Sequence, residues 1–130
     1  MRHFNAGLAI PDFPLAYGGL VPPLSAFPIL IHFLHRVGAL VVLLLVALTL
    51  WQVLRHHGAD AMLRRPAVAM GWLLALQIAL GAAVIWTQRA PTITALHLVN
   101  GALLLAAAAV LALRAWLLTE PPAAQLSAAE

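Results

Sequence analysis

Long apolar stretches alternate with short polar segments along this chain of 130 residues. Three stretches, at about residues 28–55, 66–87 and 93–118, each reach the roughly 20 residues that a helix needs to cross a bilayer. The polar segments between them are short, as connections between antiparallel helices usually are. The pattern therefore predicts an all-α, polytopic membrane protein whose transmembrane domain, residues 28–118, contains three helices.

The two flanking segments follow a different pattern. Residues 1–27 lack the apolar core of a cleavable signal peptide, and prolines and a glycine pair exclude a long helix there: Pro11, Pro14, Pro22, Pro23 and Gly18-Gly19. We expect these residues to form an irregular outer loop. Residues 119–130, rich in alanine and containing Pro121-Pro122, predict a disordered cytoplasmic tail.

Composition narrows the class further. The chain is 64% hydrophobic and 8% charged, against about 25% charged in a soluble domain, which indicates an integral membrane protein. The pI of 11.2 reflects a scarcity of acids, since the net charge is only +3 and the basic residues are scattered arginines. Nucleic acid is therefore excluded as a partner. The absence of cysteine excludes disulfides, thiolate metal sites and cysteine nucleophiles.

Arginines set the expected orientation. Arg55, Arg64 and Arg65 flank the first connection, and the positive-inside rule places such residues in the cytoplasm. The outer loop then lies outside, and we expect a multi-pass protein of the inner cell membrane. His56-His57 in this connection is either a metal site or a solvated pair, and we favour the solvated pair.

Ionisable residues stand at the head of the first span. His32, His35 and Arg36 lie there, although a central arginine costs roughly 2.5–3.5 kcal/mol in a bilayer. His97 enters the third span at a similar depth, since His35 lies seven residues after Pro28 and His97 six after Pro91. That is about 10 Å into each helix. Because the two spans run in parallel, we predict that His35 and His97 ligate one haem iron from opposite sides.

Small residues one turn further inward support this hypothesis. Gly38 and Ala39 follow His35, and Asn100 and Gly101 follow His97, at the i+3 and i+4 offsets that share a helix face. We expect them to leave a flat slot for a porphyrin. The alternative is two unrelated polar residues, each satisfied by hydrogen bonds between helices.

Three other polar residues have two interpretations each. Arg36 either pairs with a haem propionate or extends to lipid headgroups. His32 either acts as a proton acceptor, supporting group or substrate ligand, or is an interfacial residue without a role. Gln77, one turn from Gly81, either serves helix packing or faces a cofactor edge.

Several motifs, taken in order, resemble the haem A synthase family. The stretch 5–23, with Gly7-Leu8, Pro11-Asp12-Phe13-Pro14 and Pro22-Pro23, is similar to the outer loop of that family. His35-Arg36 resembles its His-Arg ligand motif. The segments 76–82 and 94–97 resemble the next span and the second ligand helix. The resemblance covers about residues 5–115.

The resemblance implies a fold and a reaction. Family members have eight spans in two four-helix halves, each with a histidine pair, and oxidise the C8 methyl of haem O to the formyl of haem A for cytochrome oxidase. It implies a haem A synthase-like oxidoreductase in which His35 and His97 hold iron, Arg36 holds a propionate and His32 acts near the reacting edge. The implied cofactor is haem b and the implied substrate is haem O. Implied partners are membrane lipid, a second copy or second half, haem O synthase and cytochrome oxidase assembly factors.

The sequence departs from the family pattern at identifiable places. It resembles spans two to four of one half, without the preceding span or the second half. Ile10 and Ala16 stand where many members have a cysteine pair, His32 stands where many have glutamate, and Phe13 replaces tryptophan. These departures leave two alternatives to the enzyme: a non-catalytic haem b-binding module or electron carrier, and an N-terminally truncated fragment.

Overall fold

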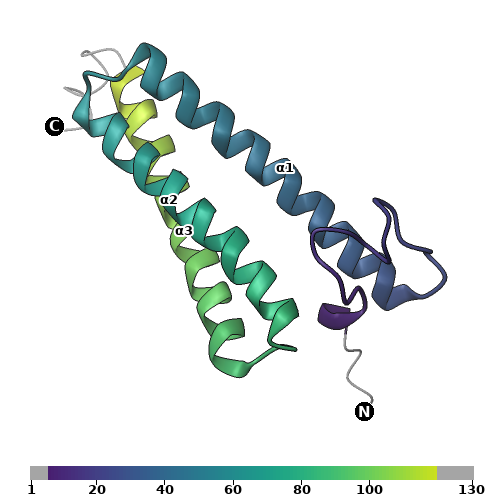
Figure 1. Ribbon diagram of the computed structural model, residues 1–130. Coiled ribbons are helices and arrows are strands. Elements are labelled where there is room, and N and C mark those ends of the chain that lie inside the picture. Colours follow the sequence, from purple (N-terminus) through teal and green to yellow (C-terminus); the bar gives the residue numbers. More distant parts are fainter. Residues whose placement is uncertain (1–5, 120–130) are drawn as a thin grey trace, which may run out of the picture.

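Three long helices form the protein. The computed structural model describes residues 6–119, in which a short 3-10 helix, η1 (Ala6–Leu8), precedes α1 (Phe27–His56), α2 (Ala61–Trp86) and α3 (Pro91–Thr119) (Figure 1). All three long helices are apolar and long enough to cross a membrane. The predicted all-α fold with three spans is confirmed. The predicted disordered tail lies outside the described residues, except for Thr119.

The start of α2 differs from the expected position near residue 66. The helix begins five residues earlier, at Ala61, because the Asp60 carboxylate caps it by accepting a hydrogen bond from the Met62 backbone N–H at 2.8 Å. Pro66 therefore lies inside the helix and cannot donate to the Met62 carbonyl one turn before it. Arg114 of α3 donates to that carbonyl instead, at 2.9 Å. This bond ties the first turn of α2 to the end of α3.

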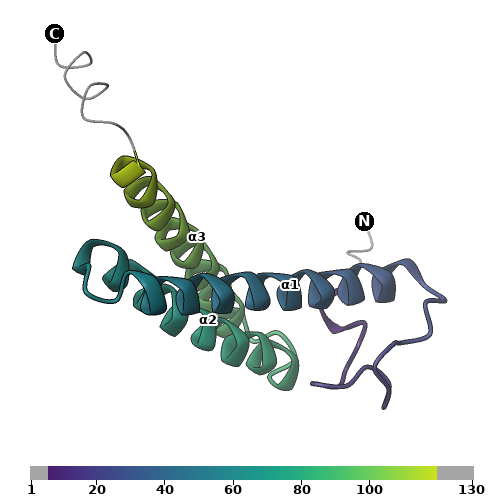
Figure 2. The ribbon, with the colours of Figure 1, turned by 90° about the horizontal axis from the view of Figure 1, so that it is seen from above.

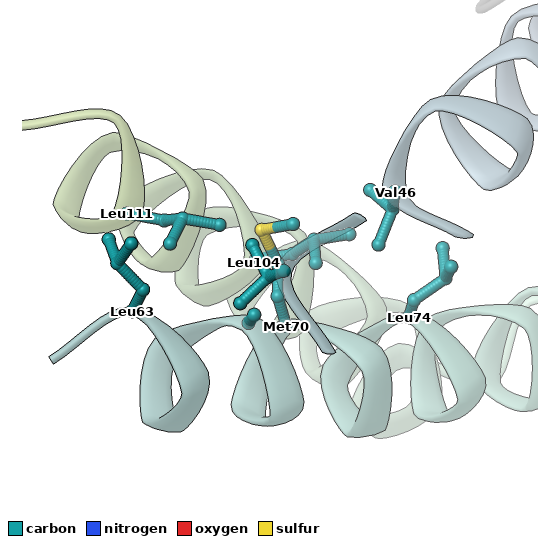
Figure 3. Close-up of a cluster of buried hydrophobic side chains, with 8 residues drawn as sticks. Val46, Leu63, Met70, Leu74, Leu104 and Leu111 are labelled. Carbon is teal, nitrogen blue, oxygen red and sulfur yellow. The ribbon is translucent and has the colours of Figure 1, made fainter. Parts of the chain in front are cut away.

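The hydrophobic core lies toward the end where α1 and α2 are joined. It contains side chains from all three helices, drawn in Figure 3: Val46, Val53, Leu63, Ala67, Met70, Leu74, Leu104 and Leu111. Most other large apolar side chains are exposed, as expected of spans that face lipid on most sides. The three helices are therefore held together mainly at this inner end.

The outer end is more open. Figure 1 shows α1 diverging from α2 and α3 toward the end that carries residues 6–26, and Figure 2 shows α3 crossing the other two helices at an angle. In the part of α1 that precedes Val46, His32 is the only buried residue. The irregular outer loop, residues 9–26, packs beside this part of α1. The open end is where the predicted site residues lie.

Candidate functional site

His35 and His97 face each other across the outer end of the molecule. Their ring centres are 6.5 Å apart and their planes meet at 71°. His35 comes from α1 and is exposed, whereas His97 comes from α3 and is half-buried. The structure thus brings together the two residues that depth along parallel helices had paired, although iron ligation by them stays a prediction.

The separation suits a single metal ion between the rings. Two imidazole–metal bonds of about 2 Å, with roughly 1 Å from each nitrogen to its ring centre, place the ring centres about 6 Å apart. The His97 Nδ1 atom is buried and has no hydrogen-bond partner among residues 6–119. A Cβ added to Gly38, one turn inward from His35, would meet no atom within 4 Å. The ring separation and the unpartnered nitrogen fit an iron-centred group held by His35 and His97, and Gly38 leaves space beside His35.

The His97 ring packs against Gln77 and Gly81 of α2. Its Nε2 atom lies 3.4 Å from the side-chain nitrogen of Gln77. The Asn100 amide donates to Gln77 Oε1 at 2.7 Å and to the Leu73 backbone carbonyl at 2.9 Å. Gln77, for which the sequence left two interpretations, therefore contacts the candidate ligand itself.

The prediction that Asn100 and Gly101 leave a flat slot for a porphyrin beside His97 is wrong. Asn100 is buried and bonded to α2, and a Cβ on Gly101 would come within 3.1 Å of the Gln77 side chain. The offsets i+3 and i+4 mark a helix face but not the neighbour that it meets, and on α3 this face meets α2. Gly81 likewise accommodates the His97 ring, which a Cβ there would approach to 3.4 Å.

Arg36 fastens the outer loop onto α1. Its guanidinium donates to the backbone carbonyls of Leu15 at 2.8 Å, Asp12 at 2.7 Å and Ile10 at 3.3 Å. It also lies 5.8 Å from the ring centre of Phe13, a cation–π distance. The structure therefore gives Arg36 partners that neither sequence interpretation included. Propionate binding stays a prediction.

His32 lies beneath the same loop. The Ile10 backbone N–H points at its Nδ1 atom at 3.2 Å, and Arg36 Nε points at its Nε2 atom at 3.3 Å. A neutral imidazole can accept only one hydrogen bond, and a protonated one accepts none. His32 is 7% exposed, so its surroundings suit a buried acceptor that holds the loop. Its catalytic role stays a prediction.

Asp12 organises the tip of the outer loop. Its two carboxylate oxygens accept hydrogen bonds from the backbone N–H groups of Tyr17 at 2.8 Å and Gly18 at 2.9 Å. Both residues have positive φ, as the central pair of a type I′ turn requires. The N–H groups of Gly18 and Tyr17, and to a smaller extent the charge of Arg36, hold the pKa of Asp12 below its ordinary value.

Aromatic contact links the loop to α2. The Phe13 ring meets Trp86 edge to face, with ring centres 6.3 Å apart. The loop thus bridges the diverging ends of α1 and α2. Elsewhere, His56 and His57 are exposed, and the described residues contain no cluster of three or more potential metal ligands. An apolar groove near Val46 and Leu111, at the opposite end, contains none of the predicted site residues.

The fold and the paired histidines define a polytopic helical membrane protein with a two-histidine site near one end of its spans. Residues 1–109 match the family described as Cytochrome oxidase assembly protein (COX15-CtaA), and the chain belongs to this family. The predicted family resemblance is thereby confirmed.

Curated relatives give the same assignment. The chain is 38% identical over 82 residues to the haem A synthase of Symbiobacterium thermophilum, covering 63% of this chain and 26% of that protein. It is 33% identical over 93 residues to the haem A synthase of Geobacillus kaustophilus (68% and 27%) and 32% identical over 98 residues to that of Alkalihalophilus pseudofirmus (75% and 32%). The chain therefore spans 26–32% of the length of these relatives. No solved structure matches it.

Proposed function

We propose that this chain is a haem-binding part of a haem A synthase-like membrane oxidoreductase, in which His35 and His97 would hold a haem iron. The facing of these two rings, 6.5 Å apart on parallel spans, is the observation that carries the proposal. Family membership and the names of the relatives agree with it. Bound as haem b, the group would supply one-electron redox chemistry.

The proposed reaction oxidises the C8 methyl of haem O to a formyl group. With water as the source of oxygen, it releases four protons and four electrons to an acceptor in the inner cell membrane. The chain spans under a third of its relatives, so we propose that a second copy or a second half completes the enzyme. Membrane lipid, haem O synthase and cytochrome oxidase assembly factors are further proposed partners.

The contacts of the chain's own residues support a proposed role for each. Arg36 directs four N–H groups at His32 and the loop carbonyls, which leaves one of its five for a propionate. The outer loop that it fastens restricts water at the open end. His32 is placed to hold this loop one turn outward from His35.

A spectrum of the purified protein tests the ligands. We expect a six-coordinate low-spin haem spectrum for the full chain and its loss in His35→Ala and in His97→Ala. His56→Ala removes an exposed histidine outside the site and should leave the spectrum unchanged. An unaltered spectrum in both ligand variants would overturn the assignment.

A second candidate function is a non-catalytic haem b carrier. The environment of His32 favours this candidate. Each of its ring nitrogens faces an N–H donor of the protein, so no free base is available beside the site. Supplying the membrane-embedded chain with haem O and separating the extracted pigments distinguishes the two. Haem A or a hydroxylated intermediate indicates an enzyme, whereas unchanged haem O indicates a carrier.

A further inference from the structure

A second hollow lies at the inner end of the molecule, where the first turns of α2 meet the end of α3. Its volume is about 500 Å³, within the roughly 300–1,000 Å³ that is typical of small-molecule sites. Among the described residues, the lining contains two arginines, small or apolar side chains and no acid: Ala61, Met62, Arg65, Pro66, Ala69 and Arg114. The hollow therefore combines positive charge with apolar walls.

The α2 side of the hollow is one stripe of the helix. Ala61, Arg65 and Ala69 follow one another at intervals of four residues, which places their side chains on one face. The two alanines fill little of the space beside them. The stripe extends from the first residue of α2 over about 12 Å of helix. It therefore leads from the polar connection into the apolar part of the span.

A hydrogen bond fixes the second guanidinium at the hollow. Pro66 has no N–H to donate to the Met62 carbonyl, and Arg114 donates to this carbonyl from α3 at 2.9 Å. The bond uses one of the five N–H groups of Arg114 and holds its charge at the first turn of α2. The other N–H groups of Arg114, together with those of Arg65, are then placed to serve a ligand in the hollow.

The charge at this end of the molecule suits an anion. Four arginines lie here, whereas Asp60 is the only acid at this end within residues 6–119, and its carboxylate caps α2. Guanidinium groups match phosphate oxygens in both charge and geometry. The positive-inside rule predicts that this end is cytoplasmic, and basic pockets between spans on that side typically bind the headgroups of anionic lipids.

We propose that this hollow binds an anionic phospholipid, with its phosphate between Arg65 and Arg114 and its apolar part against Ala69. Free phosphate carries the same recognised group, but the apolar wall at Ala69 and the exposed Met62 beside it favour a lipid. A lipid bound here connects the start of α2 to the end of α3. Neither haem nor the two paired histidines enter this inference, so it stands or falls independently of the proposed function.

Lipid titration of the full chain in a neutral detergent tests the site. We expect phosphatidylglycerol to bind more tightly than phosphatidylcholine with the same acyl chains, because only phosphatidylglycerol has a net negative charge. An arginine near an anionic lipid contributes a factor of about five. Arg65→Gln should therefore weaken the binding of phosphatidylglycerol about fivefold and leave that of phosphatidylcholine unchanged.

Arg64→Gln is the matched control. It removes an equal charge from the neighbouring position, which is exposed and lies outside the lining, and it should bind phosphatidylglycerol as the unaltered chain does. Equal affinities for the two lipids in the unaltered chain, or equal losses in Arg64→Gln and Arg65→Gln, would overturn the proposal. Because Arg65 is exposed, its replacement should leave the fold intact, and a thermal unfolding curve checks this.

A second variant tests the apolar wall without changing the charge. Ala69→Phe fills the hollow and should weaken the binding of phosphatidylglycerol, whereas Ala75→Phe, at an exposed position of α2 outside the lining, should not. Equal affinities in these two variants would contradict a lipid in this hollow.

Inorganic phosphate separates the two sources of the phosphate group. We expect millimolar phosphate to leave phosphatidylglycerol bound, because the free ion makes no contact with the apolar wall. Displacement of the lipid at constant ionic strength would assign the site to a soluble phosphate and overturn the lipid proposal.

Discussion

Asp12 stabilises the turn that follows it only while its carboxylate is charged. Its folded pKa lies below the ordinary value because it accepts the Gly18 and Tyr17 N–H groups. Its contribution to loop stability is therefore complete above the unfolded pKa of about 3.9 and is lost as pH falls through the folded pKa. We expect the amide proton shifts of Tyr17 and Gly18 to titrate together below pH ~3.9, and not to titrate in Asp12→Asn. A midpoint at the ordinary value would contradict this.

Arg36 fastens the outer loop through three hydrogen bonds to its backbone. Hydrogen bonds to a charged group contribute about 1.5–3 kcal/mol each. Lysine carries all its donors on one nitrogen and lacks the planar fork that reaches these carbonyls from two nitrogens. In Arg36→Lys, we expect the buried Ile10 N–H to exchange with solvent roughly 10–100 times faster, as a loss of about 1.5–3 kcal/mol implies. Hydrogen exchange followed by NMR measures this. Arg55→Lys, at the inner end of α1, is the matched control, and equal rates in both variants would count against the fastening role.

At the scale of single residues, the sequence predicted the pairing of His35 with His97 but not the other contacts of the site. The similar depths of His35 and His97 on two spans of the same direction were sufficient to predict that the two residues lie close together. The partners of Arg36 are backbone carbonyls of Ile10, Asp12 and Leu15, which no side-chain pattern reveals. Asn100 was assigned to the wrong neighbour because periodicity gives the face of a helix but not its rotation relative to other helices.

Pro66 and Arg114 form a pair that joins two elements. Pro66 leaves the Met62 carbonyl without its helical donor, and Arg114 supplies the replacement. Arg114→Leu should destabilise the fold by about 1–3 kcal/mol, because that carbonyl becomes unpaired. In a Pro66→Ala background the new N–H can reach the carbonyl, so the same change should cost much less. A double-mutant cycle by denaturant titration in detergent measures the coupling, and additive effects would argue against it.

The lengths of the apolar stretches predicted the number of long helices but not where α2 begins. Arg64 and Arg65 fall below any hydropathy threshold, so the sequence placed the start of the second span near Pro66. The cap at Asp60 and the bond from Arg114 extend the helix over these arginines. A capping residue next to a helix can be recognised in a sequence, but a hydrogen bond to a carbonyl from a residue 52 positions away cannot.

The whole molecule has its core at one end and its candidate site at the other. The buried apolar cluster joins the inner halves of the helices, and the outer loop, through Arg36 and Phe13, joins the outer halves. This division places His35 and His97 at the end of the molecule away from the core. Hydropathy alone could not have predicted the divergence of α1, since its apolar residues lie on all sides.

The distribution of arginines predicts how the molecule lies in the membrane. Of the described arginines, Arg55, Arg64, Arg65 and Arg114 lie at the end with the α1–α2 connection, and Arg36 and Arg89 lie at the other. The positive-inside rule predicts that the first end is cytoplasmic and that the candidate site lies near the external face.

Single cysteines can test this orientation directly, because the chain has none of its own. Leu20, which is 86% exposed in the outer loop, and Ala59, exposed in the α1–α2 connection, offer one position at each end. In spheroplasts, a membrane-impermeant maleimide should label Leu20→Cys at once and Ala59→Cys only after permeabilisation. Ala79→Cys, on the lipid-facing surface of α2, should react with neither treatment. Labelling of Ala59→Cys in intact spheroplasts would show the opposite topology, with the two histidines on the cytoplasmic side.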